Sequence, residues 1–451
     1  MALKLPARII FACLVVVLVC SIYIHYDYRG ILTNISLPSF DRGGDDKNNH
    51  DDSGLYNSSV HRKITSLSTP DGKWFKINWL DDRAYNPNIL PHPTQPDHYI
   101  VAALQVQVSD EVTDSAELVC NAIFVDGTLT CMSTPKPLPI KPVRGQCKGE
   151  LAFFNFRKGP RDARVFYGPD GPYIMYGSLG TRNCLGLYLQ DLRTLLNDFD
   201  AETKTSDAFA NGTELARPPP VNDVQKNWFI FWDAQNQFYV HHDIFPNRTF
   251  SQLSADGSVG TDLSVQAKKN DDACMARFMP IPKTKHEKVH QTTNSLAITL
   301  CKRSDPKCSP SDDNTFIMTI FHYQTFYDWH AQYYPHVMLF RRNSPFEVHA
   351  ISQKPLWIWG KPLYTNESES VIKGDWAPEG HTDLFYVTSM SWKNPDQRYQ
   401  GFIDDPLFIS FGIEDTRSGA IDVTAGDMLK DLGFCADVKI PIGSTYKINM
   451  A

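Results

Sequence analysis

The sequence predicts an all-β fold, and three features of the chain support this prediction. Apolar residues make up 42% of the 451 residues and aromatic residues 12%, which is enough for a large core. From Trp74 onward, short alternating apolar runs are interrupted by turn dipeptides such as Asp126-Gly127 and Asp170-Gly171. Segments with helical periodicity are few, and the clearest covers residues 185–199, where five leucines would share one face. We therefore expect strands throughout, with a connecting helix at 185–199.

A loose repeat among the β segments predicts the number of sheets. Each repeat opens with a polar motif, continues into an aromatic-rich strand and ends in a hairpin partner. The repeats start near Asn86, Arg161, Lys226, Gln291 and Gly380. Spacings of roughly 65 to 90 residues suit four-stranded blades with insertions. We predict a five-bladed β-propeller; the alternative is a double β-sandwich with a separate small domain.

The N-terminus has the pattern of a membrane signal. Lys4 and Arg8 precede an apolar run of sixteen residues at 9–24. A spanning helix usually needs about 20 residues, and a cleaved signal peptide has an apolar stretch of comparable length. The bulky sequence SIYIHYDYR that follows the run favours an uncleaved signal anchor over a cleavage site. The flanking positive charge then predicts a single-pass type II protein of the Golgi or endoplasmic reticulum membrane with a lumenal domain.

These features divide the chain into four parts. Residues 1–28 are predicted to form a cytosolic tail and signal-anchor helix, 29–73 a disordered stem, 74–435 the propeller, and 436–451 a C-terminal tail. The stem prediction depends on the stretch DRGGDDKNNHDDSG, which is too polar to bury a core.

Glycosylation sequons and cysteines agree with a lumenal location. Every Asn-x-Ser/Thr sequon lies beyond the apolar run, at Asn34, Asn57, Asn211, Asn247 and Asn366. Eight cysteines also follow the run and contain no CxxC motif, so we expect structural disulfides rather than zinc or redox chemistry. Cys301 and Cys308 close a short loop and are the first pair expected.

Several functional classes lack a signal in this chain. The net charge of −7 and the pI near 6.0 argue against nucleic acid as a partner. No HExxH, GxSxG, GxGxxG or GxxxxGK(S/T) motif occurs, and the Asp-x-Asp at Asp198 follows the expected helix in a polar stretch. We expect no metal and no cofactor.

The polar motifs, taken in order, resemble a known superfamily. NPNILPHP, RDARVF, KNWFIFWDAQNQFYVHHDIFP, TIFHYQTF and LFISFGIEDTRSGAIDV are similar to motifs of the five-bladed propellers that include β-mannoside phosphorylases and fungal and protist β-mannosyltransferases, and more distantly furanosidase-type glycosidases. The resemblance covers residues 84–432. Two departures are Arg161 and Ala163, where relatives carry Glu and Pro, and Gln291-Thr292-Thr293, where many carry Arg-Gly-Gly-Thr. These departures argue against a phosphorylase-type phosphate site.

Because inner strands of a propeller start near a central channel, polar residues at these starts should converge on one pocket. With the resemblance, this predicts Asp162 as the carboxyl group that handles the proton at the glycosidic oxygen and Asp405 as a second carboxylate. Arg164, Lys226, Asn227 and His322 are the predicted substrate ligands. The alternatives are a strand-end ion pair of Asp162 with Arg164 and a hydrogen-bonded core histidine at His322.

The resemblance implies a glycosyltransferase-like enzyme that moves a sugar, with β-mannose from a nucleotide-sugar donor as the first expectation, to a glycan or glycoconjugate acceptor. The predicted anchor favours transfer, because a phosphorylase would need a supply of free oligosaccharide in the lumen. A glycan-trimming glycoside hydrolase on the same scaffold is the alternative enzyme. A non-catalytic glycan-binding propeller is the alternative outside enzymes, and the altered RDAR motif favours it.

Overall fold

The computed structural model describes residues 55–108, 113–143, 145, 147–199, 207–327, 330–364 and 381–438. The predicted anchor at 9–24, the sequons at Asn34 and Asn366, and most of the predicted C-terminal tail lie outside these residues. Within them, no helix has the length and apolar character needed to cross a membrane.

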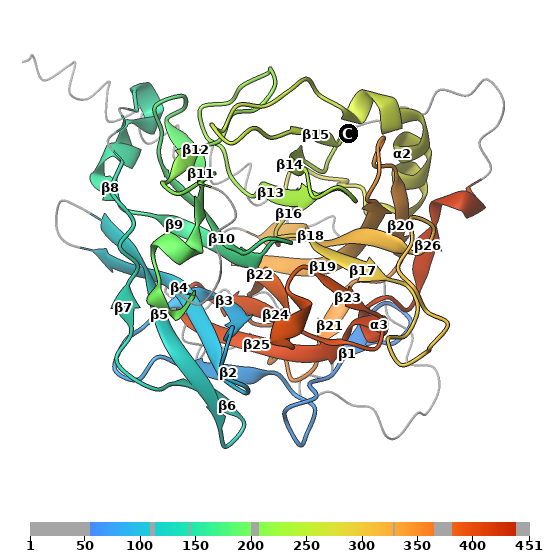
Figure 1. Ribbon diagram of the computed structural model, residues 1–451, viewed down its shortest axis with the longest axis horizontal. Helices are drawn as coiled ribbons and strands as arrows, with labels where there is room; N and C mark the ends of the chain where they lie inside the picture. The colour runs from blue at the N-terminus through green and yellow to red at the C-terminus, as the bar shows by residue number, and fades with distance from the viewer. Residues whose placement is uncertain are drawn as a thin grey trace, which may run out of the picture. The chain divides into compact units, whose positions relative to one another are not determined.

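The strands form five antiparallel groups that follow one another in chain order, which we call blades 1 to 5 (Figure 1). Blade 1 contains β3 (Tyr85–Pro91), β4 (Tyr99–Val108), β5 (Thr113–Val125) and β6 (Thr128–Cys131). Blade 2 contains β9 (Arg161–Tyr167), β10 (Pro172–Leu179), β11 (Leu185–Asp191) and β12 (Thr213–Glu214). Blade 3 contains β13 (Phe229–Trp232), β14 (Phe238–Asp243) and β15 (Thr249–Gln252).

The remaining blades complete the series. Blade 4 contains β16 (Glu287–Gln291), β17 (Leu296–Thr299), β18 (Thr315–Tyr327), β19 (His330–Arg341), β20 (Val348–Ser352) and β26 (Leu432–Phe434). Blade 5 contains β22 (Phe385–Trp392), β24 (Pro406–Ile413), β25 (Arg417–Thr424) and β2 (Phe75–Asn78). Short strands lie between or beside the blades: β1 (Arg62–Ile64), β7 (Lys136–Pro137), β8 (Arg157–Lys158), β21 (Leu356–Ile358) and β23 (Gln400–Phe402).

Strand β2 closes the ring. It is the outer strand of blade 5, where Phe75 pairs antiparallel with Ala420 of β25. Its other edge pairs parallel with β6 of blade 1, with Ile77 opposite Leu129. One strand thus joins the last blade to the first and removes two open sheet edges. The described chain is an all-β five-bladed propeller, as predicted, and its inner strands begin close to the predicted repeat starts.

Neighbouring inner strands are held together by buried side chains. Asn88 of β3 donates to the carbonyl of Ala163 (3.1 Å) and accepts from the amide of Val165 (3.0 Å), both in β9. In the same way Asn294 exchanges two hydrogen bonds with the backbone of Met390 in β22. Buried asparagine side chains therefore form hydrogen bonds with backbone N–H and C=O groups of the next blade. These bonds hold the inner strands of neighbouring blades together.

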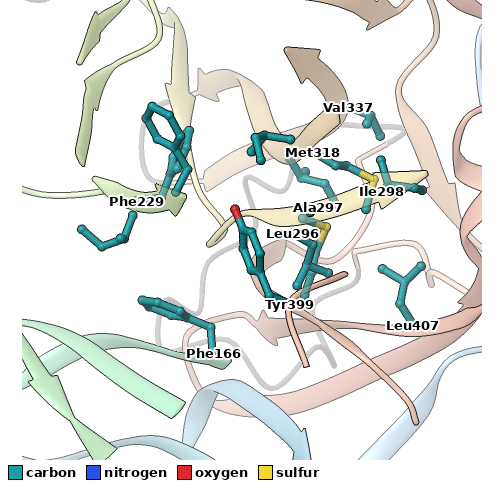
Figure 2. Packing of buried hydrophobic residues seen from close by; sticks show 14 of the residues in the cluster. Phe166, Phe229, Leu296, Ala297, Ile298, Met318, Val337, Tyr399 and Leu407 are labelled. Carbon is teal, nitrogen blue, oxygen red and sulfur yellow. The ribbon is translucent and has the colours of Figure 1, made fainter. Parts of the chain in front are cut away.

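The largest core cluster draws side chains from four blades. Phe166 of blade 2, Phe229 of blade 3, Leu296 and Met318 of blade 4, and Leu407 of blade 5 are all at most 1% exposed (Figure 2). Complete burial of one such side chain stabilises the fold by about 1.5–3 kcal/mol. Trp228, which directly follows the predicted ligand Asn227, belongs to this core rather than to the cavity.

The predicted helix at 185–199 is wrong. The expected helix at 185–199 is strand β11 followed by two 3-10 turns, η2 (Leu192–Thr194) and η3 (Asn197–Phe199). Every residue of β11 is buried, so leucines occupy both faces of the strand. Their spacing in the sequence therefore resembles that of an apolar helix face. The helix that does form, α2 (Ser264–Phe278), has a polar sequence with few large apolar residues. The other α-helix, α3 (Ala425–Met428), is a single turn, and the remaining 3-10 segments are η1 (Gly149–Phe156), η4 (Pro395–Gln397) and η5 (Cys435–Asp437).

The predicted stem also needs correction at its C-terminal end. Strand β1 pairs parallel with β21, and the hydroxyls of Ser66 and Ser68 donate to the buried carboxylate of Asp422 (2.6 and 2.7 Å). Residues 62–73 are therefore part of the folded unit. The polarity that suggested a stem lies upstream of them.

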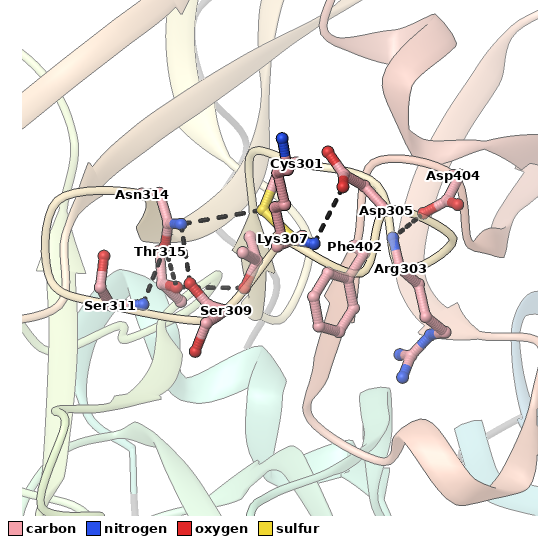
Figure 3. Close-up of a disulfide and its surroundings, with 12 residues drawn as sticks. Cys301, Arg303, Asp305, Lys307, Ser309, Ser311, Asn314, Thr315, Phe402 and Asp404 are labelled. Atoms are coloured by element: carbon pink, nitrogen blue, oxygen red, sulfur yellow. Dashed lines mark hydrogen bonds between the residues drawn. A yellow bond between two sulfur atoms is a disulfide. The ribbon is translucent and has the colours of Figure 1, made fainter.

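All eight cysteines after the apolar run are paired in disulfides, as predicted. The bridges are Cys120–Cys131, Cys147–Cys184, Cys274–Cys435 and Cys301–Cys308. The last is the short loop expected from spacing, and hydrogen bonds such as that from the Arg303 amide to Asp404 hold the loop against blade 5 (Figure 3).

Candidate active site

A cavity of about 740 Å3 opens where the inner strands of blades 1, 2 and 3 begin. Asn86, Asp162 and Asn227 line it, each at or near the start of its inner strand. Their φ angles are 56°, 53° and 62°. Asn and Asp adopt this left-handed conformation more readily than other non-glycine residues, and such backbone strain clusters at functional sites. The same local geometry thus brings three polar side chains from three blades to one cavity.

Three carboxylates line the cavity: Asp162, Asp415 and Glu287, whose Oε2 accepts the amides of Lys283 and Thr284. Asp162 is exposed, and its carboxylate accepts no hydrogen bond from the described residues. Asp415 lies in the turn between β24 and β25. Asp415 is exposed at its turn, yet the protein atoms around it desolvate its carboxylate. This desolvation, followed by the negative charges of Asp162 and Glu414, raises the pKa of Asp415 to about 6. Asp415 is therefore coupled to Asp162 through their charges and holds its proton more readily than an isolated aspartate.

Arg164 lies beneath Asp162 and is only 4% exposed. Its Nε donates to the carbonyl of Thr292 (2.7 Å), and its Nη1 donates to the backbone carbonyls of Asp162 (2.8 Å) and Ala163 (3.3 Å). Among the described residues, Arg164 forms no ion pair with a carboxylate. The structure therefore contradicts the alternative prediction that Arg164 and Asp162 form a strand-end ion pair. Instead, a positive charge is held in the cavity wall by backbone carbonyls.

Two lysines add positive charge to the lining. Lys226 and Lys288 are exposed to the cavity, and neither forms an ion pair with the residues the structure describes. Burial, followed by the positive charges of Lys226, Arg164 and Lys288, lowers the pKa of His290 to about 4. The imidazole is therefore neutral at physiological pH. An anionic group would meet three cations near His290.

Another part of the lining is apolar. It is formed by Phe245, Pro246, Ile281, Pro282 and Val289. Thr284, Glu287, Gln324, Tyr333 and Tyr386 complete the cavity wall. The cavity thus combines a carboxylate pair, a cationic group and an apolar surface.

The cavity brings together four of the six predicted catalytic and ligand residues: Asp162, Arg164, Lys226 and Asn227. His322 is near it but fully buried. The rings of Tyr333 and Tyr386 lie 5.0 Å and that of His290 5.5 Å from its ring, and these three residues line the cavity. Neither ring nitrogen of His322 has a hydrogen-bond partner among the described residues, and burial holds its pKa well below the usual value.

Asp405, the predicted second carboxylate, is not in the cavity lining. It accepts from Arg303 Nε (2.9 Å) and Nη2 (2.8 Å) and from the amide of Phe402 (2.7 Å). These bonds anchor the Cys301–Cys308 loop to blade 5. Asp405 precedes the first residue of β24, whereas the carboxylate that lines the cavity, Asp415, lies just after the last residue of this strand.

Gln291 and Thr292 stand where many members of the resembling superfamily carry Arg-Gly. Both side chains form hydrogen bonds within the fold. Gln291 bonds to the His241 side chain through its oxygen (2.8 Å) and donates to the carbonyls of His241 and His242 through its nitrogen (2.8 and 3.0 Å). The Thr292 hydroxyl donates to the carbonyl of Val387. These side chains are buried and hold blades 3, 4 and 5 together rather than facing the cavity.

Comparison with known proteins gives remote structural similarity. No protein-family description and no curated protein sequence matches the chain. The β-1,2-mannobiose phosphorylase of Listeria innocua is 11% identical with a TM-score of 0.43, over 82% of this chain and 96% of that one. A GDP-Man-dependent mannosyltransferase of Leishmania mexicana is 12% identical with a TM-score of 0.38, over 78% and 89%. The arabinanase Arb43A of Bacillus subtilis is 9% identical with a TM-score of 0.33, over 76% and 96%.

Several polar lining residues were not predicted from the sequence, among them Asn86, Lys288 and Asp415. Asn86 is the first residue of the NPNILPHP motif. Its position in this motif is equivalent to those of Asp162 and Asn227 in theirs, and this equivalence could have predicted it as a lining residue. Asp415 lies in the turn of the motif GIEDTRSG. Its place at the end of a strand, on the same side as the starts of inner strands, follows from the antiparallel order of blade 5.

Other predicted features can be placed on the surface. Asn211 and Asn247 are exposed and Asn57 is half-buried.

In the part of the chain that the structure describes, no group of three His, Cys, Asp or Glu side chains is arranged to hold a metal ion.

Proposed function

We propose that this protein is a glycosyltransferase-like enzyme that transfers a sugar from a nucleotide-sugar donor to a glycan acceptor. One observation carries the proposal: the same cavity contains a coupled carboxylate pair and a cationic group without carboxylate partners among the described residues. The carboxylates suit proton transfer at a sugar hydroxyl, and the cations suit a diphosphate.

The lining supports an orientation for the donor. The diphosphate lies against Lys226, Lys288 and Arg164, and the transferred sugar lies toward Asp162 and Asp415. The nucleoside packs on the apolar surface that includes Phe245 and Ile281. In this arrangement the acceptor hydroxyl attacks the anomeric carbon, the bond from that carbon to the diphosphate oxygen breaks, and the carboxylate pair takes the hydroxyl proton. The lysines balance the charge of the departing nucleoside diphosphate.

The sequence supplies the proposed setting. An uncleaved anchor at residues 9–24, followed by five sequons and eight cysteines, supports a type II protein of the Golgi or endoplasmic reticulum membrane. There the propeller would act on glycoproteins or glycolipids that pass through the lumen. β-Mannose is the first donor sugar to test, because the motifs at Asn86, Asp162 and Lys226 resemble those of β-mannoside-active propellers.

A glycoside hydrolase is the second candidate, and the carboxylate pair itself favours it. Hydrolysis needs two carboxyl groups on either side of a glycosidic bond and no cationic group. A hydrolase would therefore use Asp162 and Asp415 and leave Lys226 and Lys288 without a role in the chemistry.

Nucleotide release separates these functions. The purified full-length protein is incubated with a panel of nucleotide sugars, with and without glycan acceptors. Acceptor-dependent release that falls in Lys226→Ala and Lys288→Ala supports transfer. Glycan shortening without a donor supports hydrolysis, and glycan binding without either reaction supports a non-catalytic propeller.

A further inference from the structure

A buried glutamate lies directly behind the candidate catalytic carboxylate. Glu117 is on β5 of blade 1, and its exposed fraction is 0%. Its Oε1 accepts the amide hydrogen of Ala163, the residue after Asp162, at 3.1 Å. Its Oε2 is also buried and has no hydrogen-bond partner among the described residues. A fully buried glutamate with one unpaired oxygen is unusual, because burying an ionised carboxylate costs free energy.

The surroundings favour the neutral form of Glu117. Burial is the largest influence and, with the negative charge of Asp162, raises the pKa of Glu117 to about 8, against the smaller opposing effects of the Ala163 amide and Arg164. At neutral pH the side chain is therefore a protonated acid whose carbonyl oxygen faces Ala163. It can fill the space and accept one hydrogen bond without adding a third negative charge beside Asp162 and Asp415.

The hydrogen bond to Ala163 acts on the backbone that carries Asp162. Asp162 has a φ of 53°, a conformation that an aspartate adopts only when its neighbours are held in place. The Ala163 amide is bound by Glu117 and its carbonyl by Asn88 (3.1 Å), so blade 1 holds both polar groups of this residue. Arg164 adds bonds to the carbonyls of Asp162 and Ala163 from the other side.

We propose that Glu117 is a positioning residue, which accepts the Ala163 amide and thereby fixes Asp162 in the left-handed conformation that directs its carboxylate into the cavity. This inference rests on the proposed function, since it assigns Glu117 a part in catalysis through Asp162. Glu117 itself touches no substrate.

The test uses the full-length protein with three substitutions. Glu117→Ala removes the acceptor, Glu117→Gln keeps an acceptor oxygen of the same shape, and Glu214→Ala is the matched control. Glu214 is also a buried glutamate whose oxygens accept backbone amides, those of Thr181 and Arg182, but it does not line the cavity. Misplacing a reacting group by about 1 Å can lower turnover roughly 10²-fold.

We therefore expect Glu117→Ala to lower kcat by about 10²-fold with little change in KM, Glu117→Gln to retain wild-type kcat at pH 7, and Glu214→Ala to lower thermal stability with kcat unchanged. An unchanged kcat in folded Glu117→Ala overturns the proposal. So does a loss in Glu117→Gln at pH 7 equal to that in Glu117→Ala.

A pH profile tests the role even if Glu117→Ala fails to fold. The charges of Asp162 and Arg164 shift the pKa of Glu117, and the charge of Glu117 in turn raises the pKa of Tyr85. Ionisation of Glu117 near pH 8 adds a negative charge next to Asp162, so wild-type kcat should fall there, and the fall should be absent in Glu117→Gln. Identical profiles for the two proteins contradict the proposal.

Hydrogen exchange provides a readout that does not depend on turnover. The Ala163 amide should exchange slowly in the wild type and in Glu117→Gln, and at least about tenfold faster in Glu117→Ala, where it loses its buried acceptor. Equal exchange in wild type and Glu117→Ala rejects the inference. Absence of any reaction by the wild type, with this exchange pattern intact, rejects the proposed function alone.

Discussion

At the scale of single residues, Asp162 is the side chain on which the proposed chemistry depends. Its carboxylate accepts no hydrogen bond from the described residues, so Asp162→Asn removes an ionisable group without breaking a hydrogen bond. We expect turnover to fall by at least roughly 10²-fold, the usual contribution of a positioned acid or base. The melting temperature should stay at the wild-type value. Steady-state kinetics and thermal unfolding of the same preparation measure both.

The matched control for this substitution is Asp405→Asn. Asp405 is buried and paired with Arg303, so its substitution should lower stability and leave activity per folded molecule unchanged. The opposite pattern, a stable and inactive Asp405→Asn with an active Asp162→Asn, would restore the sequence prediction for Asp405 and remove Asp162 from the mechanism.

Asp415 predicts a pH dependence. Its pKa of about 6 lies above the ordinary value because the surrounding protein desolvates it and Asp162 and Glu414 repel its charge. The wild-type rate should rise through about pH 6 as Asp415 loses its proton and can act as a base. In Asp415→Asn the inflection near pH 6 should be absent, because the group that titrates there has been removed. An inflection that remains at pH 6 would assign it to another group.

The same raised pKa has a consequence for stability. A group whose pKa is raised on folding contributes stability that is fully present below its unfolded-state pKa and is lost as pH rises through the folded-state value. Asp415 should therefore weaken the fold progressively between about pH 4 and pH 6. We expect Asp415→Asn to become more stable relative to the wild type over this interval, as measured by denaturant unfolding. A constant difference between the two proteins would contradict the assignment.

At the scale of elements, two disulfides differ in what they join. Cys301–Cys308 closes a loop with a sequence separation of 7, whereas Cys274–Cys435 connects α2 to η5 across a separation of 161. Because loop-closure entropy grows with loop length, removing the second bridge should cost about 5 kcal/mol and removing the first about 2–3 kcal/mol in the chain-entropy model. Paired Cys→Ala variants compared by denaturant unfolding test this order. Equal losses would show that native-state contacts, not chain entropy, dominate.

At the scale of the whole molecule, closure of the ring depends on β2. A chain that starts at residue 55 keeps β1 and β2 and should unfold in one cooperative transition. A chain that starts at residue 82 lacks both strands, which leaves β25 and β6 with open edges. We expect this shorter chain to lose cooperative unfolding or to aggregate. Cooperative unfolding of both chains at the same temperature would show that closure does not require β2.

Membrane topology is also a property of the whole chain. If residues 9–24 anchor the protein with its propeller in the lumen, residues beyond 28 should resist protease in sealed microsomes. Glycosidase treatment should lower the apparent mass, and replacing the exposed Asn211 or Asn247 by Gln should remove one glycan each. Protease digestion of the propeller in sealed vesicles would contradict the lumenal location.

The sequence by itself determined the all-β class, the five strand starts, the Cys301–Cys308 bridge and four of the cavity residues. These follow from local patterns: alternation with a period of two, turn dipeptides, and a polar residue before each inner strand. Asp162 and Asn227 could be predicted because each occupies the same position in its own repeat, and Lys226 directly precedes Asn227.

Only the tertiary structure decided the rest, because it depends on which distant segments meet. Asp415 and Asp405 lie at opposite ends of β24, and only the packing of blade 5 shows which end faces the cavity. The leucines at 185–199 suit a helix and a fully buried strand equally well until pairing with β10 selects the strand. Glu117 precedes Ala163 by 46 residues, and its contact with Ala163 exists because blades 1 and 2 pack side by side.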